Sequence, residues 1–192
     1  GGALGAALLS YGGKTQFTPY LGYKISRKID PKEVVNCLLK NKIAGVANGR
    51  AEYGPRALGN RSLLADPREI QTKDLVNDIK QRQKFRPFAP AILEEHCHDY
   101  FDMPDHSRYM SYTYQCTRSD DIPACLHVDN SARVQTVPET SNSILRPILE
   151  AWYERTGCPV LLNTSLNVRG KPMVNDWSDA QLFSKKYSVD VF

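Results

Sequence analysis

Residues 43–65, IAGVANGRAEYGPRALGNRSLLA, contain two short runs that are typical of buried strands, at residues 43–47 and 61–65. Residues 48–60 lie between them and are punctuated by glycine and proline, which indicates a loop. Glycines let the backbone approach a ligand closely, and arginines can fork onto phosphate or carboxylate oxygens. The region therefore predicts two strands joined by a candidate binding loop.

Helices and strands alternate irregularly on either side of this region. Asp30, Pro31 and Glu33 predict a helix start, because Asp caps a helix and Pro suits its first position. The clearest helix covers residues 142–156 and ends at Gly157. Other helices are expected at residues 1–11, 69–83 and 176–186, and other strands at residues 88–93, 109–115, 132–137, 159–162 and 189–192. Residues 12–29 are expected to be a connector, extended around Tyr20. The pattern favours an α/β or α+β domain with a mixed sheet.

The composition is that of an ordinary globular protein, with 192 residues, 41% hydrophobic and 24% charged. No apolar run approaches the roughly 20 residues of a membrane helix, and residues 3–9 lack the basic flank of a signal peptide. We therefore expect a cytoplasmic protein without a membrane partner. Its five scattered cysteines contain no CxxC pair and fit a reducing compartment. Because the chain opens Gly1-Gly2, we expect it to be a piece of a longer protein.

A metal site is not expected within this chain. His96, Cys97 and His98 are consecutive and could suggest metal binding, but no second ligand pair lies at a typical spacing. The alternative, which we prefer, is a helix start whose polar residues face water.

The net charge of +4 is concentrated in one segment. Residues 50–86 hold nine basic and five acidic residues, so they account for the whole excess. Clustered arginines among turn residues indicate an anionic ligand, although a solvated basic face would look similar. A nucleic-acid surface usually carries a larger excess, so a nucleic-acid partner is not expected.

Three loops carry the candidate chemistry: residues 49–62, 80–90 and 162–172. The first matches neither the P-loop nor the Rossmann glycine pattern. The second places Lys80 near a helix end and Arg86 at a strand start, so that the turn between them can bring both to one site. The third leaves a buried strand with short hydrogen-bonding side chains that could face a phosphate or simply cap their own turn.

No Ser-His-Asp or Cys-His arrangement is visible, so acyl-enzyme chemistry is not indicated. The basic and polar side chains suit phosphoryl or adenylyl transfer, which depends mainly on positioning and on positive charge around the phosphates.

Four sequence blocks together resemble the NodU/CmcH carbamoyltransferase family. They are GRAEYGPRALGNRS at residues 49–62, FRPFAP at residues 85–90, SARVQTV at residues 131–137 and LNTSLN at residues 162–167. Ala51, Tyr53 and Leu166 depart from the usual residues, but they change apolar packing rather than charge.

The resemblance implies a YrdC-like domain, a twisted mixed sheet with flanking helices, over residues 30–192. Residues 1–29 would be the end of a preceding Kae1-like domain and a connector. Such a domain takes carbamoyl phosphate and ATP, the latter expected with magnesium, and forms carbamoyl adenylate. The Kae1-like domain then passes the carbamoyl group to a substrate hydroxyl. Iron is expected only in that domain, so this chain should not complete the transfer alone.

The motif match also assigns roles to individual residues. The expected catalytic residues are Lys80, Arg86, Arg133 and Ser165. The expected substrate- and nucleotide-binding residues are Arg56, Asn60, Arg61, Asn163 and Asn167. For some of them a scaffold role is the alternative: Arg61 and Arg50 could pair with Asp66 and Glu52 and only hold the loop, and Asn163 could cap a turn.

Two other functions remain open from the sequence. One is a YrdC-like RNA- or nucleotide-binding module without its own catalysis. The other is a purely structural domain that docks on its partner domain. The carbamoyl acceptor is not specified by these residues.

Overall fold

The computed structural model describes residues 2–13 and 16–192, so Gly1, Lys14 and Thr15 of the expected N-terminal helix and connector lie outside the described residues. The helices are α1 (Gly2–Tyr11), α2 (Pro31–Asn41), α3 (Ile70–Ile79), α4 (Cys97–Tyr100), α5 (Leu145–Thr156) and α6 (Trp177–Tyr187). The strands are β1 (Tyr20–Ile25), β2 (Ile43–Ala47), β3 (Gly49–Glu52), β4 (Arg61–Ala65), β5 (Ala89–Leu93), β6 (Phe101–Asp102), β7 (Thr113–Cys116), β8 (Ser131–Arg133), β9 (Gln135–Val137) and β10 (Val160–Ser165).

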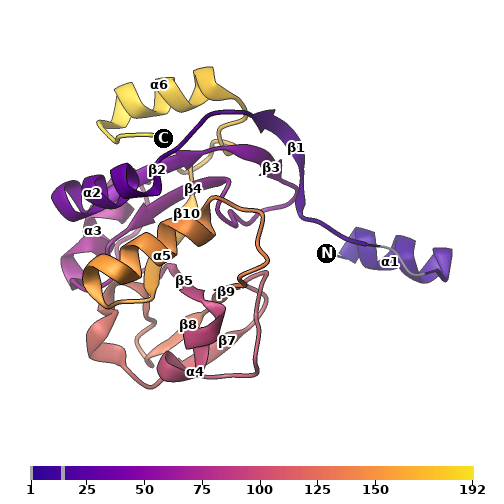
Figure 1. Cartoon of the computed structure of the whole chain (residues 1–192), viewed down its shortest axis with the longest axis horizontal. Coiled ribbons are helices and arrows are strands. Elements are labelled where there is room, and N and C mark those ends of the chain that lie inside the picture. The colour runs from indigo at the N-terminus through magenta and orange to yellow at the C-terminus, as the bar shows by residue number, and fades with distance from the viewer. Residues whose placement is uncertain (1, 14–15) are drawn as a thin grey trace.

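A five-stranded sheet forms the centre of the molecule, with strand order β2-β4-β10-β5-β9 (Figure 1). Neighbouring strands are antiparallel except for β5 and β9, which are parallel, so the sheet is mixed as expected. The last residues of the chain add to its edge, because Val191 forms a parallel bridge with Gly45 of β2. The predicted strand at residues 189–192 is therefore a single bridge.

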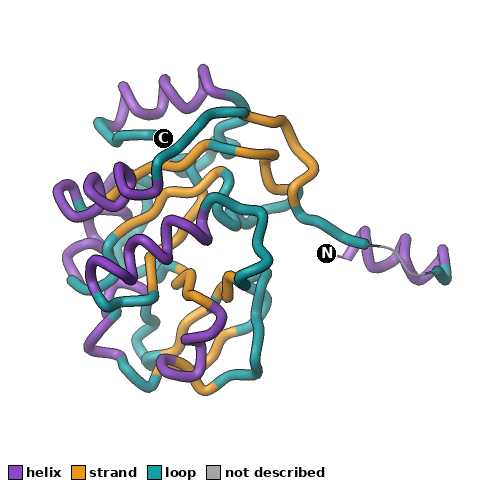
Figure 2. Tube along the Cα trace, in the orientation of Figure 1, coloured by secondary structure: helices purple, strands orange, loops and turns teal. Residues whose placement is uncertain are grey.

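Helices cover both faces of this sheet (Figure 2). On one face, Val34 of α2 and Trp152 of α5 pack in a common core with Leu64 and Leu161 of the sheet. On the other face, α3 and α6 contribute to a second core that includes Leu63 and Leu162, the alternate residues of the same strands. Strands buried on both faces read as continuous apolar runs, which is why β2, with the sequence IAGVA, could be recognised.

A smaller, three-stranded antiparallel sheet, β6-β7-β8, lies beside the central one and has its own core around Phe101 and Ile122. The chain passes from β8 of the small sheet into β9 of the central sheet through Val134, which is fully buried. The single strand predicted at residues 132–137 is thus two strands in two sheets, and the predicted strand at residues 109–115 forms only from Thr113.

The N-terminal segment runs away from this body. Helix α1 contains no buried residue among those described and projects from the molecule, followed by β1, which pairs antiparallel with β3 (Figure 1). Strand β3 falls within residues 48–60, where the sequence predicted only a loop. It has only four residues, and its sequence, GRAE, lacks the apolar alternation by which strands are recognised.

The predicted helix boundaries are close to those observed. Asp30 caps α2 by accepting a hydrogen bond from the backbone N–H of Lys32 at 2.9 Å, and Asp176 caps α6 in the same way through Asp179 at 3.0 Å. Helix α3 ends earlier than predicted, at Ile79, and Lys80 is its C-terminal cap. Within the described residues, no helix combines the length and apolar character needed to cross a bilayer.

Candidate functional site

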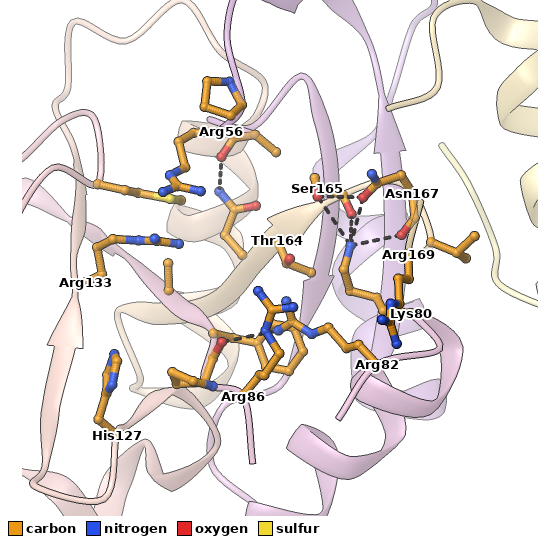
Figure 3. A pocket seen from close by; sticks show the side chains of 18 of the residues that line it. Arg56, Lys80, Arg82, Arg86, His127, Arg133, Thr164, Ser165, Asn167 and Arg169 are labelled. Carbon is orange, nitrogen blue, oxygen red and sulfur yellow. Dashed lines mark hydrogen bonds between the residues drawn. The ribbon is translucent and has the colours of Figure 1, made fainter. Parts of the chain in front are cut away.

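A positively charged cavity of about 560 Å³ lies where the two sheets meet (Figure 3). Among the described residues that line it are five arginines and one lysine, and none of the lining residues is Asp or Glu. The basic residues are Arg56, Lys80, Arg82, Arg86, Arg133 and Arg169. Such a set attracts an anion with several negative charges and offers forked donors to its oxygens.

The loop that carries Arg56 is stabilised by a buried carboxylate, that of Glu52. Glu52 Oε1 accepts the backbone N–H groups of Leu58 at 2.7 Å, Asn60 at 2.8 Å and Arg61 at 3.3 Å. Burial raises the pKa of Glu52, and these three donors act in the opposite direction. The turn also requires Gly59, whose φ is +121° and whose missing Cβ would clash with Ser143 and Leu145. Glu52 therefore fixes the loop and leaves its tip free to face the cavity.

Arg61 is part of the scaffold rather than of the cavity lining. It is fully buried, with 0% of its surface exposed, and its guanidinium donates only to backbone carbonyl oxygens among the described residues. The acceptors are Tyr23 at 2.9 Å, Asn48 at 2.9 Å, Gly49 at 3.3 Å, Asn60 at 2.9 Å and Asn175 at 2.9 and 3.3 Å. This is the scaffold role given above as the alternative, but without the ion pair to Asp66, which binds Lys42 and Arg68 instead.

Asn60 and Arg50 also lie away from the charged cavity. The Asn60 amide donates to Arg50 O at 2.8 Å and accepts from Ser143 Oγ at 2.8 Å, and both Asn60 and Arg50 line a second cavity of about 470 Å³. Arg50 donates to Gly22 O at 3.2 Å and makes no ion pair with Glu52, whose bonded oxygen is taken by backbone donors. The structure thus separates Asn60 and Arg61 from the other predicted site residues.

Lys80 joins the end of α3 to the loop after β10. Its Nζ donates to Ser165 O at 2.5 Å and Ser165 Oγ at 3.3 Å, and to Asn167 O at 2.9 Å and Asn167 Oδ1 at 3.0 Å (Figure 3). The side chain has no carboxylate partner among the described residues, and Lys80 is only 4% exposed. Burial, with Arg82 and Arg86 nearby, lowers the Lys80 pKa from 10.5 to about 7. The ammonium can therefore lose its proton near neutral pH unless an anion binds.

The arginines that line the cavity differ in whether their side chains already have hydrogen-bond partners. Arg82 donates to Asn77 Oδ1 at 2.7 Å and to Pro87 O at 3.2 Å, and its guanidinium lies 4.1 Å from the centre of the Phe88 ring. Burial, Arg86 and Arg133 lower the Arg82 pKa to about 10. In the described part of the chain, no hydrogen bond or ion pair engages the side chains of Arg56, Arg86, Arg133 or Arg169.

Asn163 of β10 forms part of the cavity wall. Its Nδ2 donates to Gln135 Oε1 at 2.7 Å and to Ala57 O at 3.2 Å, so it ties β10 to β9 and to the arginine loop. Gln135 Nε2 in turn donates to Leu58 O at 3.1 Å. Asn163 therefore does not cap a turn, which was the alternative that the sequence left open.

Seven of the nine predicted site residues line this one cavity. They are Arg56, Lys80, Arg86, Arg133, Asn163, Ser165 and Asn167. Arg82, His127 and Arg169 also line the cavity, and Gln135 contacts Asn163 from behind the lining; none of these four was singled out from the sequence. Arg82 and Arg169 lie inside the loops quoted above, so the clustering of basic residues was the available signal. Gln135 lies in the SARVQTV block at residues 131–137, from which only Arg133 was assigned a role.

The donor set fits phosphate groups and does not fit a protein-held metal ion. Magnesium prefers oxygen ligands, above all carboxylates, and the described lining offers none. Across residues 2–13 and 16–192, no group of three or more His, Cys, Asp or Glu is placed to hold a metal ion. His96 and His98 instead contact Asp99 and Asp105, at 2.8 and 3.1 Å.

Comparison with known proteins gives consistent matches. A family model described as carbamoyltransferase C-terminus matches residues 35–192. Nodulation protein NolO of Bradyrhizobium diazoefficiens is 42% identical over 144 residues, which are 72% of this chain and 26% of that protein. The 3'-hydroxymethylcephem-O-carbamoyltransferase of Amycolatopsis lactamdurans is 38% identical over 164 residues, which are 85% of this chain and 32% of that protein. The chain spans about a quarter to a third of the length of these relatives.

The fold is similar to part of full-length HypF, whose crystal structure is described as the phosphate- and nucleotide-bound form. The TM-score is 0.60 at 18% sequence identity, covering 84% of this chain and 24% of that chain. At this level of identity the likeness concerns the fold, and it agrees with the expected YrdC-like architecture.

Proposed function

The chain belongs to the carbamoyltransferase C-terminus family, and on this premise we propose that its charged cavity binds carbamoyl phosphate and ATP and forms carbamoyl adenylate. The observation that carries the proposal is the concentration of six basic side chains in a cavity whose described lining has no carboxylate. Binding a carbamoyl phosphate next to a nucleotide brings several phosphate charges together. Those charges need this kind of neutralisation before one group can react with another.

The proposed reaction needs water as a third reactant. Water cleaves the P–O bond of carbamoyl phosphate, which releases inorganic phosphate and leaves a carbamate. A carbamate oxygen then attacks the α-phosphorus of ATP, and pyrophosphate leaves with the electron pair of the broken P–O bond. The products are carbamoyl adenylate, pyrophosphate and phosphate. Charge develops on phosphate oxygens in both steps, and fixed cations stabilise it without moving.

Individual residues have distinct parts in this proposal. Arg56 and Arg86 have no competing partner among the described residues, so their forked donors are available to phosphate oxygens. Lys80 supplies a point charge that is already positioned by Ser165 and Asn167. Ser165 donates to Asn167 Oδ1 at 2.6 Å and can turn its hydroxyl to a ligand oxygen. Magnesium would arrive on the phosphates of the nucleotide, since the described lining of the cavity holds no carboxylate for it.

The relatives are longer than this chain, and transfer of the carbamoyl group to an acceptor hydroxyl is proposed for the rest of the protein. We retain the proposal that a Kae1-like domain with its own iron site precedes these residues. The five cysteines are all free and buried, which fits the proposed cytoplasmic location.

The test is calorimetric titration of the purified chain with ATP and with carbamoyl phosphate. We expect both to bind, and Arg86→Ala to weaken binding about tenfold or more, because a charge-assisted contact is lost. Arg155→Ala is the matched control, since Arg155 is exposed on α5 and lies outside the cavity.

If neither ligand binds to the folded parent chain, the proposed function fails for this chain. If tRNA binds and ATP does not displace it, the alternative of an RNA-binding module is favoured instead.

A further inference from the structure

Two buried polar atoms that lack a hydrogen-bond partner belong to residues that line the charged cavity. Within the described residues, the buried side-chain atoms without a partner are Glu52 Oε2, Ser62 Oγ, Arg133 Nε, Trp152 Nε1 and Asn163 Oδ1. Of these residues, only Arg133 and Asn163 line the cavity. Buried polar groups are nearly always paired, and leaving one unpaired is unfavourable. The cavity therefore presents one unsatisfied donor and one unsatisfied acceptor.

The orientation of the Asn163 amide is fixed by the backbone. Leu58 O is a carbonyl, so the Gln135 atom that contacts it must be the Nε2 donor. Gln135 Oε1 then faces Asn163, whose contacting atom must also be a donor. Ala57 O requires a donor at the same Asn163 atom. Turning the Asn163 amide over would place Oδ1 against two oxygens, so Oδ1 must remain the free acceptor.

The unsatisfied donor lies in the same corner of the cavity. Arg133 is two residues before Gln135, which holds Asn163. Arg56, which is adjacent to Ala57, is close enough to lower the pKa of Arg133, in addition to the larger effect of burial. Figure 3 shows Arg56 and Arg133 pointing into the cavity from the same side. We therefore take both atoms to lie within reach of one small group.

A phosphate cannot satisfy both atoms, because ionised phosphate oxygens accept hydrogen bonds but do not donate them. The surrounding arginines and Lys80 are donors only, so an acceptor such as Asn163 Oδ1 is unusual here. A matching ligand carries a hydrogen-bond donor beside an acceptor. The carbamoyl group has this arrangement within one planar unit, since its amino nitrogen and its oxygen are bound to the same carbonyl carbon.

We propose that Asn163 is a specificity-determining residue, whose Oδ1 accepts from the carbamoyl amino group while Arg133 Nε donates to the carbamoyl oxygen. Gln135 is a positioning residue, because it sets which Asn163 atom faces the ligand. This inference rests on the proposed function of the cavity. It adds the reason why the cavity takes carbamoyl phosphate rather than another acyl phosphate.

Acetyl phosphate provides the sharpest probe, since it replaces the amino group by a methyl group of similar size and keeps the phosphate. It would leave Asn163 Oδ1 unpaired and cover it with an apolar group. We expect the parent chain to bind carbamoyl phosphate on the order of tenfold more tightly than acetyl phosphate, which calorimetry measures directly. Equal affinities would overturn the inference and leave the proposed function standing. Failure to bind either acyl phosphate or ATP would overturn both.

Asn163→Leu removes the acceptor while keeping the approximate size of the side chain. We expect the ratio of the two affinities to fall to about one, through weaker binding of carbamoyl phosphate, with little change for acetyl phosphate or ATP. A loss confined to ATP would overturn the inference, because Asn163 would then contact the nucleotide.

Ser62→Ala is the matched control, since it deletes another unpartnered buried oxygen that does not line the cavity. It should leave the affinity ratio unchanged. If Asn163→Leu does not fold, Gln135→Leu takes its place, because the Asn163 amide is then free to turn over and the ratio should fall. An unchanged ratio in a folded Gln135→Leu variant would contradict the positioning role of Gln135.

Discussion

Arg56 and Arg61 stand five residues apart in one motif, yet they lie in opposite environments. Arg61 is fully buried and donates to carbonyl oxygens of five residues. Arg56 is exposed, lines the cavity and has no partner within the described residues. The same residue type therefore stabilises the fold in one region and keeps its donors unoccupied in the other. What distinguishes the two is whether their donors are already occupied.

The largest effect is expected on the free energy of unfolding, when the buried Arg61 is replaced. Arg61→Met keeps the length of the side chain but leaves several buried carbonyl oxygens unpaired, so we expect the free energy of unfolding to fall by about 3 kcal/mol or more. Urea denaturation followed by circular dichroism measures it. Arg56→Met is the matched control and should change stability by less than about 1 kcal/mol. Similar losses for the two variants would remove the distinction between the two regions.

Lys80 combines both behaviours, since it is bonded like Arg61 but lines the cavity like Arg56. Its pKa is lowered from 10.5 to about 7, so between these pH values the unfolded chain binds the proton more tightly than the folded chain. The free energy of unfolding should then gain a positive contribution as pH rises through this window.

Urea denaturation from about pH 6.5 to about pH 8.5 tests this prediction by comparing the parent with Lys80→Met. We expect the stability of the parent to rise relative to that of the variant over this range. The comparison of slopes matters more than the absolute loss, because the variant also lacks the Lys80 hydrogen bonds. Parallel pH profiles would show that the Lys80 ammonium is not destabilised by its surroundings.

On the cavity side, removing a charge should improve stability and impair binding. Arg133 is half-buried, its Nε has no partner among the described residues, and burial together with Arg56 lowers its pKa. We expect Arg133→Met to leave the ligand-free chain as stable as the parent or up to about 1 kcal/mol more stable. Its affinity for carbamoyl phosphate should fall about tenfold. Urea denaturation measures the stability and calorimetry measures the affinity, both on the same preparation. A marked loss of stability would show that Arg133 stabilises the fold, as Arg61 does.

The smallest effect is expected at Arg50, the remaining arginine of this motif. It is exposed, and among the described residues its side chain makes a single hydrogen bond, to Gly22 O. Arg50→Ala should change stability by less than about 0.5 kcal/mol and leave carbamoyl phosphate affinity within about twofold. A larger loss of affinity would mean that Arg50 of β3 also contributes to ligand binding.

The elements that could be predicted from the sequence are those whose signals are local. Continuous apolar runs revealed β2 and β5, and caps revealed α2 and α6, because these patterns depend on neighbours along the chain. The separation of β8 from β9 could not be predicted in this way, since it depends on which strands lie beside them. The three arginines of the first motif were indistinguishable for the same reason. Only the folded chain shows that Arg61 meets carbonyls of residues as distant as Asn175.

The passage from β8 to β9 through Val134 has a consequence for how the chain can change in length. Arg133 lines the cavity, Gln135 holds its wall, and Val134 between them is fully buried. Because side chains alternate along a strand, inserting or deleting one residue here would exchange the buried and cavity-facing positions. Residues 131–137 should therefore keep a constant length among relatives, whereas gain or loss of residues is better accommodated in exposed loops such as residues 117–121.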